Sequence, residues 1–268
     1  MLIPFVLLVP HIPTLLLDAH RRHRTEMLAA LEVASGKLKD AAPDVIAALS
    51  ARWISKGAFL VDDGSQHATL IDYTGFGVEA RYDCAGAPVL AKALITTGQK
   101  AGARVAAGKR GVDSGVTVPM RFLVPDRSVP VVPLSLALET PRECRAWGAI
   151  LRRMLAARPE RVARVIGGLI TFDPHAWQLG RDVPELRDLD ARVLAALGAG
   201  DWNALEAVRR DGAAAGERVQ TAMPLAAELR HLEVLRGVVG DGARGTLLAY
   251  ETGAGVGTAL MEFAIEDA

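Results

Sequence analysis

Leu8-Val9-Pro10-His11-Ile12-Pro13 is the stretch that points to the fold, because an apolar run ends there at two prolines that flank a histidine. The run predicts an opening β-strand, and the prolines predict a turn directly after it. In α/β proteins, side chains at the carboxyl end of a strand face the cleft where ligands bind. We therefore interpret His11 as a candidate metal ligand, with a structural histidine in a turn as the open alternative.

Short apolar runs bounded by glycine, proline or aspartate alternate along the chain with helical patterns. The further strands are predicted at residues 44–50, 58–61, 103–107, 129–135, 162–167 and 246–250. The helices are predicted at residues 25–39, 140–158, 190–197, 201–210 and 224–239, with breaks at Gly198 and Gly200. Thr140 and Glu143 form the pattern of a capping box. The order predicts one α/β domain with a helical stretch late in the chain.

Composition narrows the class of protein and its partners. The 268 residues carry 31 basic and 31 acidic side chains, and no basic block alternates with aromatic residues, so we expect no nucleic-acid partner. No apolar run approaches the roughly 18 residues that span a bilayer, so we expect no membrane partner. Cys84 and Cys144 are too few for a disulfide framework. These features predict a reduced, cytoplasmic protein.

Glu228 is a second candidate site residue, in the predicted helix of residues 224–239. It falls within a stripe of residues that recur at steps of three and four: Leu225, Glu228, Leu232, Leu235 and Val239. A buried carboxylate needs a metal ion or a guanidinium group beside it. Two alternatives stay open, since Glu228 can lie at the edge of the stripe in water or pair with His231.

Several motifs then occur in a characteristic order. They are Val-Pro-His-Ile-Pro at 9–13, Ser-Ala-Arg-Trp at 50–53, and the segments 71–76, 111–119, 130–135, 167–169 and 228–231. In this order they resemble the class III extradiol ring-cleavage dioxygenases, the LigB superfamily. The resemblance implies a single LigB-like domain over residues 1–268, with a central mixed β-sheet flanked by helices. It also implies a non-haem Fe(II), held by two histidines and one glutamate, that cleaves a catechol or aminophenol ring.

The candidate iron site departs from the family pattern. His11 matches the first iron ligand and Glu228 matches the carboxylate, but Arg52 stands where the family has the second histidine. Arginine cannot bind iron, because its guanidinium group stays protonated. Ser114 stands where the family has a histidine that acts on substrate or oxygen. The family pattern has another such histidine a few positions before the place of His175. We therefore expect a vestigial site at His11, Arg52, Ser114 and Glu228, with His175 as a possible catalytic replacement.

These losses resemble one subgroup, the non-catalytic α-subunits of 2-aminophenol 1,6-dioxygenase. The resemblance implies that the chain binds no cofactor and pairs with a catalytic LigB-like paralogue in a hetero-oligomer such as α2β2. Fe(II) would then lie in the partner subunit, and the complex would act on an aromatic small molecule. We further hypothesise that Arg52 forms an ion pair with Glu228 where iron would otherwise bind, with an ordinary surface arginine beside Trp53 as the alternative.

Two other functions remain open. The first is an active extradiol dioxygenase that rebuilt its iron site from His11, Glu228 and either His175 or His67. The second is a stand-alone protein that uses the pocket of the vestigial site to bind an aromatic ligand.

The glycine pattern of residues 253–257 looks like a phosphate loop, but its spacing is wrong for one. It predicts a turn between late strands.

Overall fold

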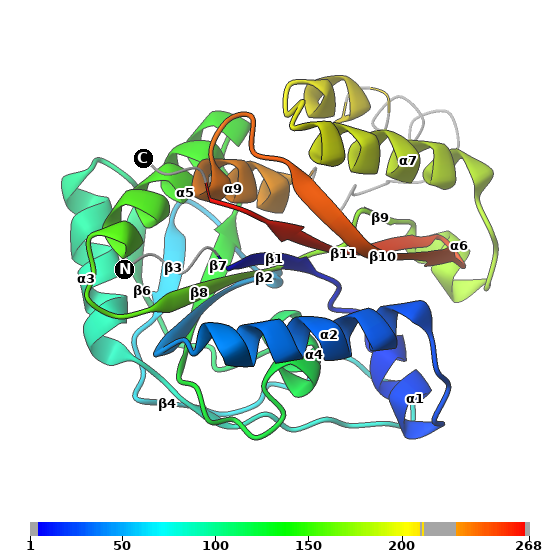
Figure 1. The fold of residues 1–268 in the computed structure, drawn as a ribbon, viewed down its shortest axis with the longest axis horizontal. Coiled ribbons are helices and arrows are strands. Elements are labelled where there is room, and N and C mark those ends of the chain that lie inside the picture. Colours follow the sequence, from blue (N-terminus) through cyan, green and yellow to red (C-terminus); the bar gives the residue numbers. More distant parts are fainter. Residues whose placement is uncertain (1–4, 210, 212–228, 266–268) are drawn as a thin grey trace.

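A mixed β-sheet forms the centre of the computed structural model, which describes residues 5–209, 211 and 229–265 (Figure 1). Its strands are β1 (Val6–Val9), β2 (Val45–Ser55), β3 (Phe59–Asp62), β6 (Val105–Gly108), β7 (Val131–Ala137), β8 (Val162–Gly167), β9 (Thr171–Phe172), β10 (Gly245–Gly253) and β11 (Val256–Phe263). The order is β10-β11-β1-β8-β2-β7-β3-β6, with β9 beside β11. A small separate sheet pairs β4 (Gln66–His67) with β5 (Cys84–Ala85).

The sheet combines parallel and antiparallel pairs. β1 runs parallel to β8 and antiparallel to β11, and β2 runs parallel to both β7 and β8. Parallel neighbours bring their carboxyl ends to one edge of the sheet, which is where open α/β sheets bind ligands. The predicted fold class, an α/β fold with a central mixed sheet flanked by helices, is confirmed.

Helices cover both faces of the sheet (Figure 1). They are α1 (Thr14–His20), α2 (Glu26–Ala41), α3 (Pro88–Lys100), α4 (Ser114–Leu123), α5 (Pro141–Ala156), α6 (Pro174–Gln178), α7 (Pro184–Ala199) and α9 (Arg230–Val239). The cluster on one face contains residues of α3, α5, α7 and α9, and the cluster on the other contains residues of α1, α2 and α4. The strands supply both clusters by alternation: Val6 and Leu8 pack into the first, and Leu7 and Val9 into the second.

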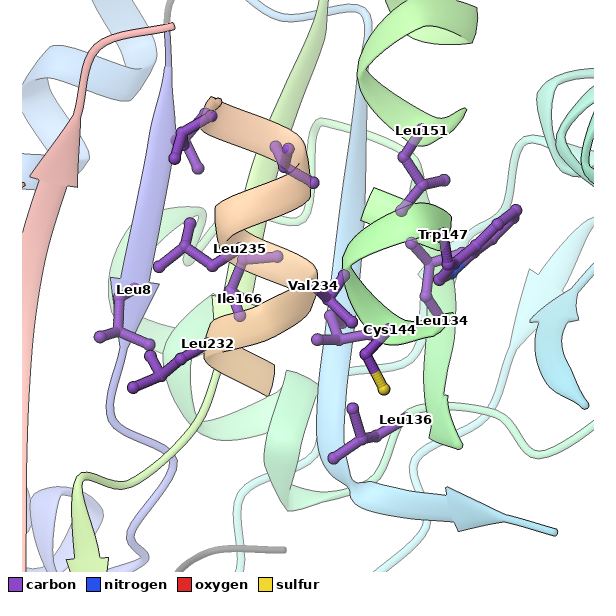
Figure 2. Packing of buried hydrophobic residues seen from close by; sticks show 14 of the residues in the cluster. Leu8, Leu134, Leu136, Cys144, Trp147, Leu151, Ile166, Leu232, Val234 and Leu235 are labelled. Atoms are coloured by element: carbon purple, nitrogen blue, oxygen red, sulfur yellow. The ribbon is translucent and has the colours of Figure 1, made fainter. Parts of the chain in front are cut away.

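The first face is packed most closely where α5 and α9 meet. Figure 2 shows Leu232 and Leu235 of α9 near Leu8 and Ile166 of the sheet, and Val234 beside Cys144 of α5. The two helix backbones touch at Gly148 and Gly237, where an added Cβ would collide with backbone atoms of the opposite helix. Glycine at these positions therefore lets the two helices share one apolar layer above the sheet.

Most predicted segments coincide with observed elements. Strand 162–167 matches β8, and the capping box of α5 is confirmed by bonds of 3.2 Å from Glu143 N to Thr140 Oγ1 and 2.9 Å from Thr140 N to Glu143 Oε2. The predicted turn at residues 253–257 joins β10 to β11. The predicted break at Gly198 is wrong, because α7 continues through it and ends at Gly200, whose φ is +72°.

Other expectations differ in extent. The predicted helix of residues 224–239 lies partly outside the described residues, which contain it from Arg230 onward as α9. β2 continues well past the predicted end at Ser50. No helix in the described part of the chain is long and apolar enough to cross a membrane.

Candidate functional site

A cleft of about 620 Å³ lies beyond the carboxyl ends of β1 and β8 and along the last part of β2. Its polar lining includes His11, Arg52, Asp72 and Ser114. Its apolar walls include four aromatic side chains: Tyr73, Phe76, Phe172 and Trp177. An apolar cleft with a few convergent polar groups is the usual form of a small-molecule site.

His11 follows β1 and is 6% exposed. Burial above all, together with the charges of Arg52 and His231, lowers its pKa to about 3, whereas the charge of Asp72 opposes this shift. The imidazole is therefore neutral at physiological pH. Its Nδ1 atom is buried and has no hydrogen-bond partner among the described residues. This nitrogen retains the chemistry of a ligand or of a hydrogen-bonding group for a bound molecule.

Arg52 reaches the cleft because β2 departs from regular pairing. The register between β2 and β7 shifts between Ser50 and Ile54. Within this irregular segment, Ser50 Oγ accepts the backbone N–H groups of Arg52 at 3.1 Å and of Trp53 at 3.2 Å. The same hydroxyl donates to Asp113 Oδ1 at 2.6 Å. Ser50 therefore fixes the segment that carries Arg52.

Asp72 connects Arg52 to the start of α4. Arg52 Nε donates to Asp72 Oδ2 at 3.2 Å, and Arg52 Nη2 donates to the Asp72 carbonyl at 3.4 Å. The Asp72 carboxylate also accepts Ser114 N at 2.9 Å and Ser114 Oγ at 3.1 Å. A carboxylate at a helix N-terminus satisfies an otherwise unpaired N–H group. Arg52, Asp72 and Ser114 thus form one continuous polar chain along the cleft.

Three of the candidate residues from the sequence come together as expected: His11, Arg52 and Ser114 line the same cleft. Glu228 lies outside the described residues, so the hypothesis of an Arg52–Glu228 ion pair stays a prediction. Within the described residues, the ion-pair partner of Arg52 is Asp72.

The two histidines considered as replacement ligands lie elsewhere. His175 is an exposed residue of α6 that does not line the cleft, although Trp177 and Gln178 on the same helix do. His67 is 2% exposed, its Nε2 lies 3.1 Å from the Val131 carbonyl, and it also lies outside the cleft lining. The structure therefore does not bring either imidazole to His11.

Sequence patterns did not single out Asp72 or His231 as site residues. Asp72 lies in the motif of residues 71–76. Because it lies in a loop, no regular spacing in the sequence predicts which side chain it contacts. His231 entered only as an alternative partner of Glu228. It is fully buried on α9, and its ring packs against Gly168 in the space that a Cβ would fill. Because Gly168 directly precedes Leu169, which lines the cleft, His231 lies beside the cleft.

The described residues do not provide a two-histidine, one-carboxylate iron site. Nowhere in the part of the chain that the structure describes do three or more His, Cys, Asp or Glu side chains form a group able to hold a metal ion. In the cleft, His11 supplies one neutral nitrogen, and Arg52 supplies N–H donors where the resemblance would place the second ligand. The donors of the described cleft therefore do not fit Fe(II).

A protein-family model described as the catalytic LigB subunit of aromatic ring-opening dioxygenase matches residues 5–261. The chain belongs to the LigB family. LigB family members are typically non-haem iron dioxygenases, so membership supports an extradiol-type dioxygenase at this coarse level.

One curated protein and one solved structure are similar to this LigB chain. The dioxygenase tasH of Hapsidospora irregularis is 32% identical over 139 residues, which are 50% of this chain and 42% of that protein. The matched part of this LigB chain thus spans less than half of that relative. The crystal structure of the uncharacterized protein JW3007 from Escherichia coli K12 has a TM-score of 0.67 at 20% identity, and the match covers 96% of this chain and 98% of that one. This likeness shows that the two share a fold.

Proposed function

We propose that this LigB chain is an iron-free subunit of an extradiol dioxygenase that acts on an aminophenol or catechol. In this proposal it pairs with a catalytic LigB paralogue in a hetero-oligomer such as α2β2, and the partner holds the Fe(II) that supplies the oxygen chemistry. Family membership supports the reaction class. The observation that carries the subunit role is Arg52, which lies in the cleft beside His11 and pairs with Asp72.

The electrostatics of the cleft support the absence of iron from this chain. A guanidinium group stays protonated at any working pH, so it repels a divalent cation and has no lone pair to donate to one. Its charge also contributes to the lowered pKa of His11. Asp72, the carboxylate of the cleft, is already bonded to Arg52 and Ser114. Iron binding would therefore require breaking the polar chain that now joins these residues.

Iron content is the first test. The protein purified alone is loaded anaerobically with Fe(II), desalted and analysed for iron, beside Arg52→His and the control Arg142→His, an exposed arginine on α5. We expect almost no iron in the parent and control chains, and a clear gain in Arg52→His. Near-stoichiometric iron in the parent chain, or ring cleavage of 2-aminophenol by that chain alone, would contradict the proposal.

Assembly is the second test. The chain is co-expressed with a LigB paralogue that retains Ser-x-His-Trp, and the mass of the complex is measured by light scattering. We expect a hetero-oligomer whose activity toward 2-aminophenol or catechol exceeds that of the paralogue alone. A paralogue that is fully active without this chain and forms no complex with it would overturn the subunit role.

The aromatic walls of the cleft support a second candidate, a stand-alone protein that binds an aromatic ligand. The Trp177 ring lies 6.3 Å from both Phe76 and Phe172, measured between ring centroids. We expect 2-aminophenol to quench Trp177 fluorescence, and Trp177→Phe to remove this response. This second candidate is favoured if the chain binds 2-aminophenol and no LigB paralogue forms a complex with it. The placement of His175 and His67 gives no comparable support to an active enzyme with a rebuilt iron site.

A further inference from the structure

A second depression, of about 650 Å³, lies at the end of α1 and shares no residue with the cleft. It is bordered by α1, by residues 78–81, by the last turn of α4 and by Arg127. Four basic side chains line it: His20, Arg81, Arg121 and Arg127. Glu79 is the carboxylate among the lining residues, and Leu16 and Phe122 contribute apolar surface.

The guanidinium groups of this depression form no close ion pair in the described part of the chain, although the charges of Arg81 and Arg127 act on the neighbouring Asp83. Within the ranges that the structure describes, Arg81, Arg121 and Arg127 form no ion pair with any carboxylate. The whole chain carries equal numbers of basic and acidic residues, so this excess is local. Positive charges gathered in a concave surface raise the local concentration of anions.

Arg127 is held in a fixed position. Its φ is +59°, a conformation uncommon for a residue with a side chain, and its backbone N–H donates to the Val124 carbonyl at 3.0 Å. Its guanidinium group donates to the Arg81 carbonyl at 3.0 Å and lies 5.8 Å from the centroid of the Tyr82 ring. The Tyr82 hydroxyl in turn donates to the Val124 carbonyl at 2.8 Å. This arginine is therefore preorganised and retains further N–H donors.

The neighbouring segment extends the positive surface. The run His20-Arg21-Arg22-His23-Arg24 begins at the rim of the depression, and all five residues are exposed. Within the described residues, the one carboxylate paired with this run is Asp18, whose Oδ1 lies 3.5 Å from His23 Nδ1. The run thus strengthens the attraction for anions without neutralising the depression.

We propose that this depression binds a small organic dianion of the phosphate monoester class. Guanidinium groups from three separate segments converge on it, and their planar N–H forks match phosphate oxygens. Leu16 and Phe122 would contact the organic part of the ligand. A concave site with an apolar wall fits a small molecule better than the flat surface that an acidic protein segment would need. The proposal is independent of the proposed function of the cleft.

The test is calorimetric titration of the full chain with phenyl phosphate and with inorganic phosphate. We expect phenyl phosphate to bind more tightly than inorganic phosphate, and its binding to weaken as salt rises. Arg121→Gln and Arg127→Asn should each weaken it at least about tenfold, as expected for the loss of a charged hydrogen bond. Asparagine suits the positive φ of position 127. The matched control is Arg142→Gln, an exposed arginine on the opposite face of the sheet.

Melting curves identify variants that keep the parent fold, and Arg81→Gln replaces any that does not. The proposal is overturned if the parent chain binds neither phosphate, or if Arg142→Gln weakens binding as much as Arg121→Gln. It is also overturned if phosphates do not bind but Arg121→Gln loosens a complex with the LigB paralogue. In that case the basic surface contacts an acidic protein partner.

Discussion

Arg52 presents hydrogen-bond donors to the cleft, where the resemblance of the sequence would place a metal ligand. The surrounding residues match these donors, since Asp72 accepts from both Arg52 and Ser114. The sequence could predict that His11, Arg52 and Ser114 share a site, because each lies in a recognisable motif. It could not predict the partner of Arg52, because the contact between Arg52 and Asp72 depends on how the loop of residues 69–83 folds over β2.

Asp190, on α7, is a buried carboxylate whose titration should control stability. Thr171 Oγ1 and the Tyr250 hydroxyl each donate to it at 2.7 Å, and burial raises its pKa to about 6 from the usual 3.8. Since the folded state binds this proton more tightly than the unfolded state, the free energy of unfolding should decrease as pH rises from 4 to 6. The decrease is about 3 kcal/mol at most.

Asp190→Asn should remove this decrease, because asparagine does not titrate; its Oδ1 can accept from one of the two hydroxyls and its amide nitrogen can donate to the other. Urea unfolding at pH 4.5 and pH 7 measures the effect. The matched control is Asp188→Asn, which changes an exposed carboxylate of the same helix and should leave the parent's pH dependence unchanged. If the parent is equally stable at both pH values, the Asp190 carboxyl titrates normally and the explanation is wrong.

At the scale of elements, the predictions from the sequence were most accurate where the signal is local. α5 begins at the predicted residue because its capping box lies entirely within one turn. α3 has no side-chain cap, and its residues gave no comparable start signal. β11 follows the glycine-rich turn that was predicted to lie between late strands, but its bounds were not predicted, although it pairs with β1, β9 and β10. Its place in the sheet depends on partners far away in sequence, which periodicity cannot reveal.

The capping box gives a direct test of how α5 starts. Thr140→Ala removes the hydroxyl that accepts Glu143 N, and it should lower the free energy of unfolding by about 1 kcal/mol. Thr140→Ser keeps a hydroxyl and should retain most of that stability. Chemical denaturation of the three proteins compares them. Equal losses in the alanine and serine variants would show that the methyl group of Thr140, not its hydroxyl, stabilises the helix start.

The contact between α5 and α9 should tolerate no side chain at Gly237. Gly237→Ala places a Cβ against the Arg145 carbonyl and the Ala149 backbone nitrogen, so we expect a loss of roughly 1–3 kcal/mol from overpacking. Gly36 on α2 is the opposite case, since nothing lies within 4 Å of an added Cβ there. Gly36→Ala should therefore raise stability by about 0.5–1 kcal/mol. Thermal melts of both variants should shift in opposite directions.

At the scale of the whole molecule, the two apolar layers are joined by the strands between them. Because neighbouring residues of β1 pack into opposite layers, the loss of one layer should also expose the other. We therefore expect residues 1–268 to unfold in one calorimetric transition. Leu31→Ala on α2 and Leu151→Ala on α5 should each shift that same transition to lower temperature, with a loss of roughly 2–5 kcal/mol in the free energy of unfolding. Two separate transitions would instead show that the chain contains two independently folded units.

The place of β1 in the sheet also bears on how the protein is made. Val6–Val9 pairs with β8 on one side and with β11 on the other, so both neighbours are synthesised long after it. Until residues 162–167 leave the ribosome, this apolar segment has no strand to pair with, and its second neighbour at residues 256–263 comes later still. Contacts that span such distances form slowly. The nascent chain therefore carries an unpaired apolar segment at least until residues 162–167 are made, and the yield of folded protein should depend on chaperones and on growth temperature.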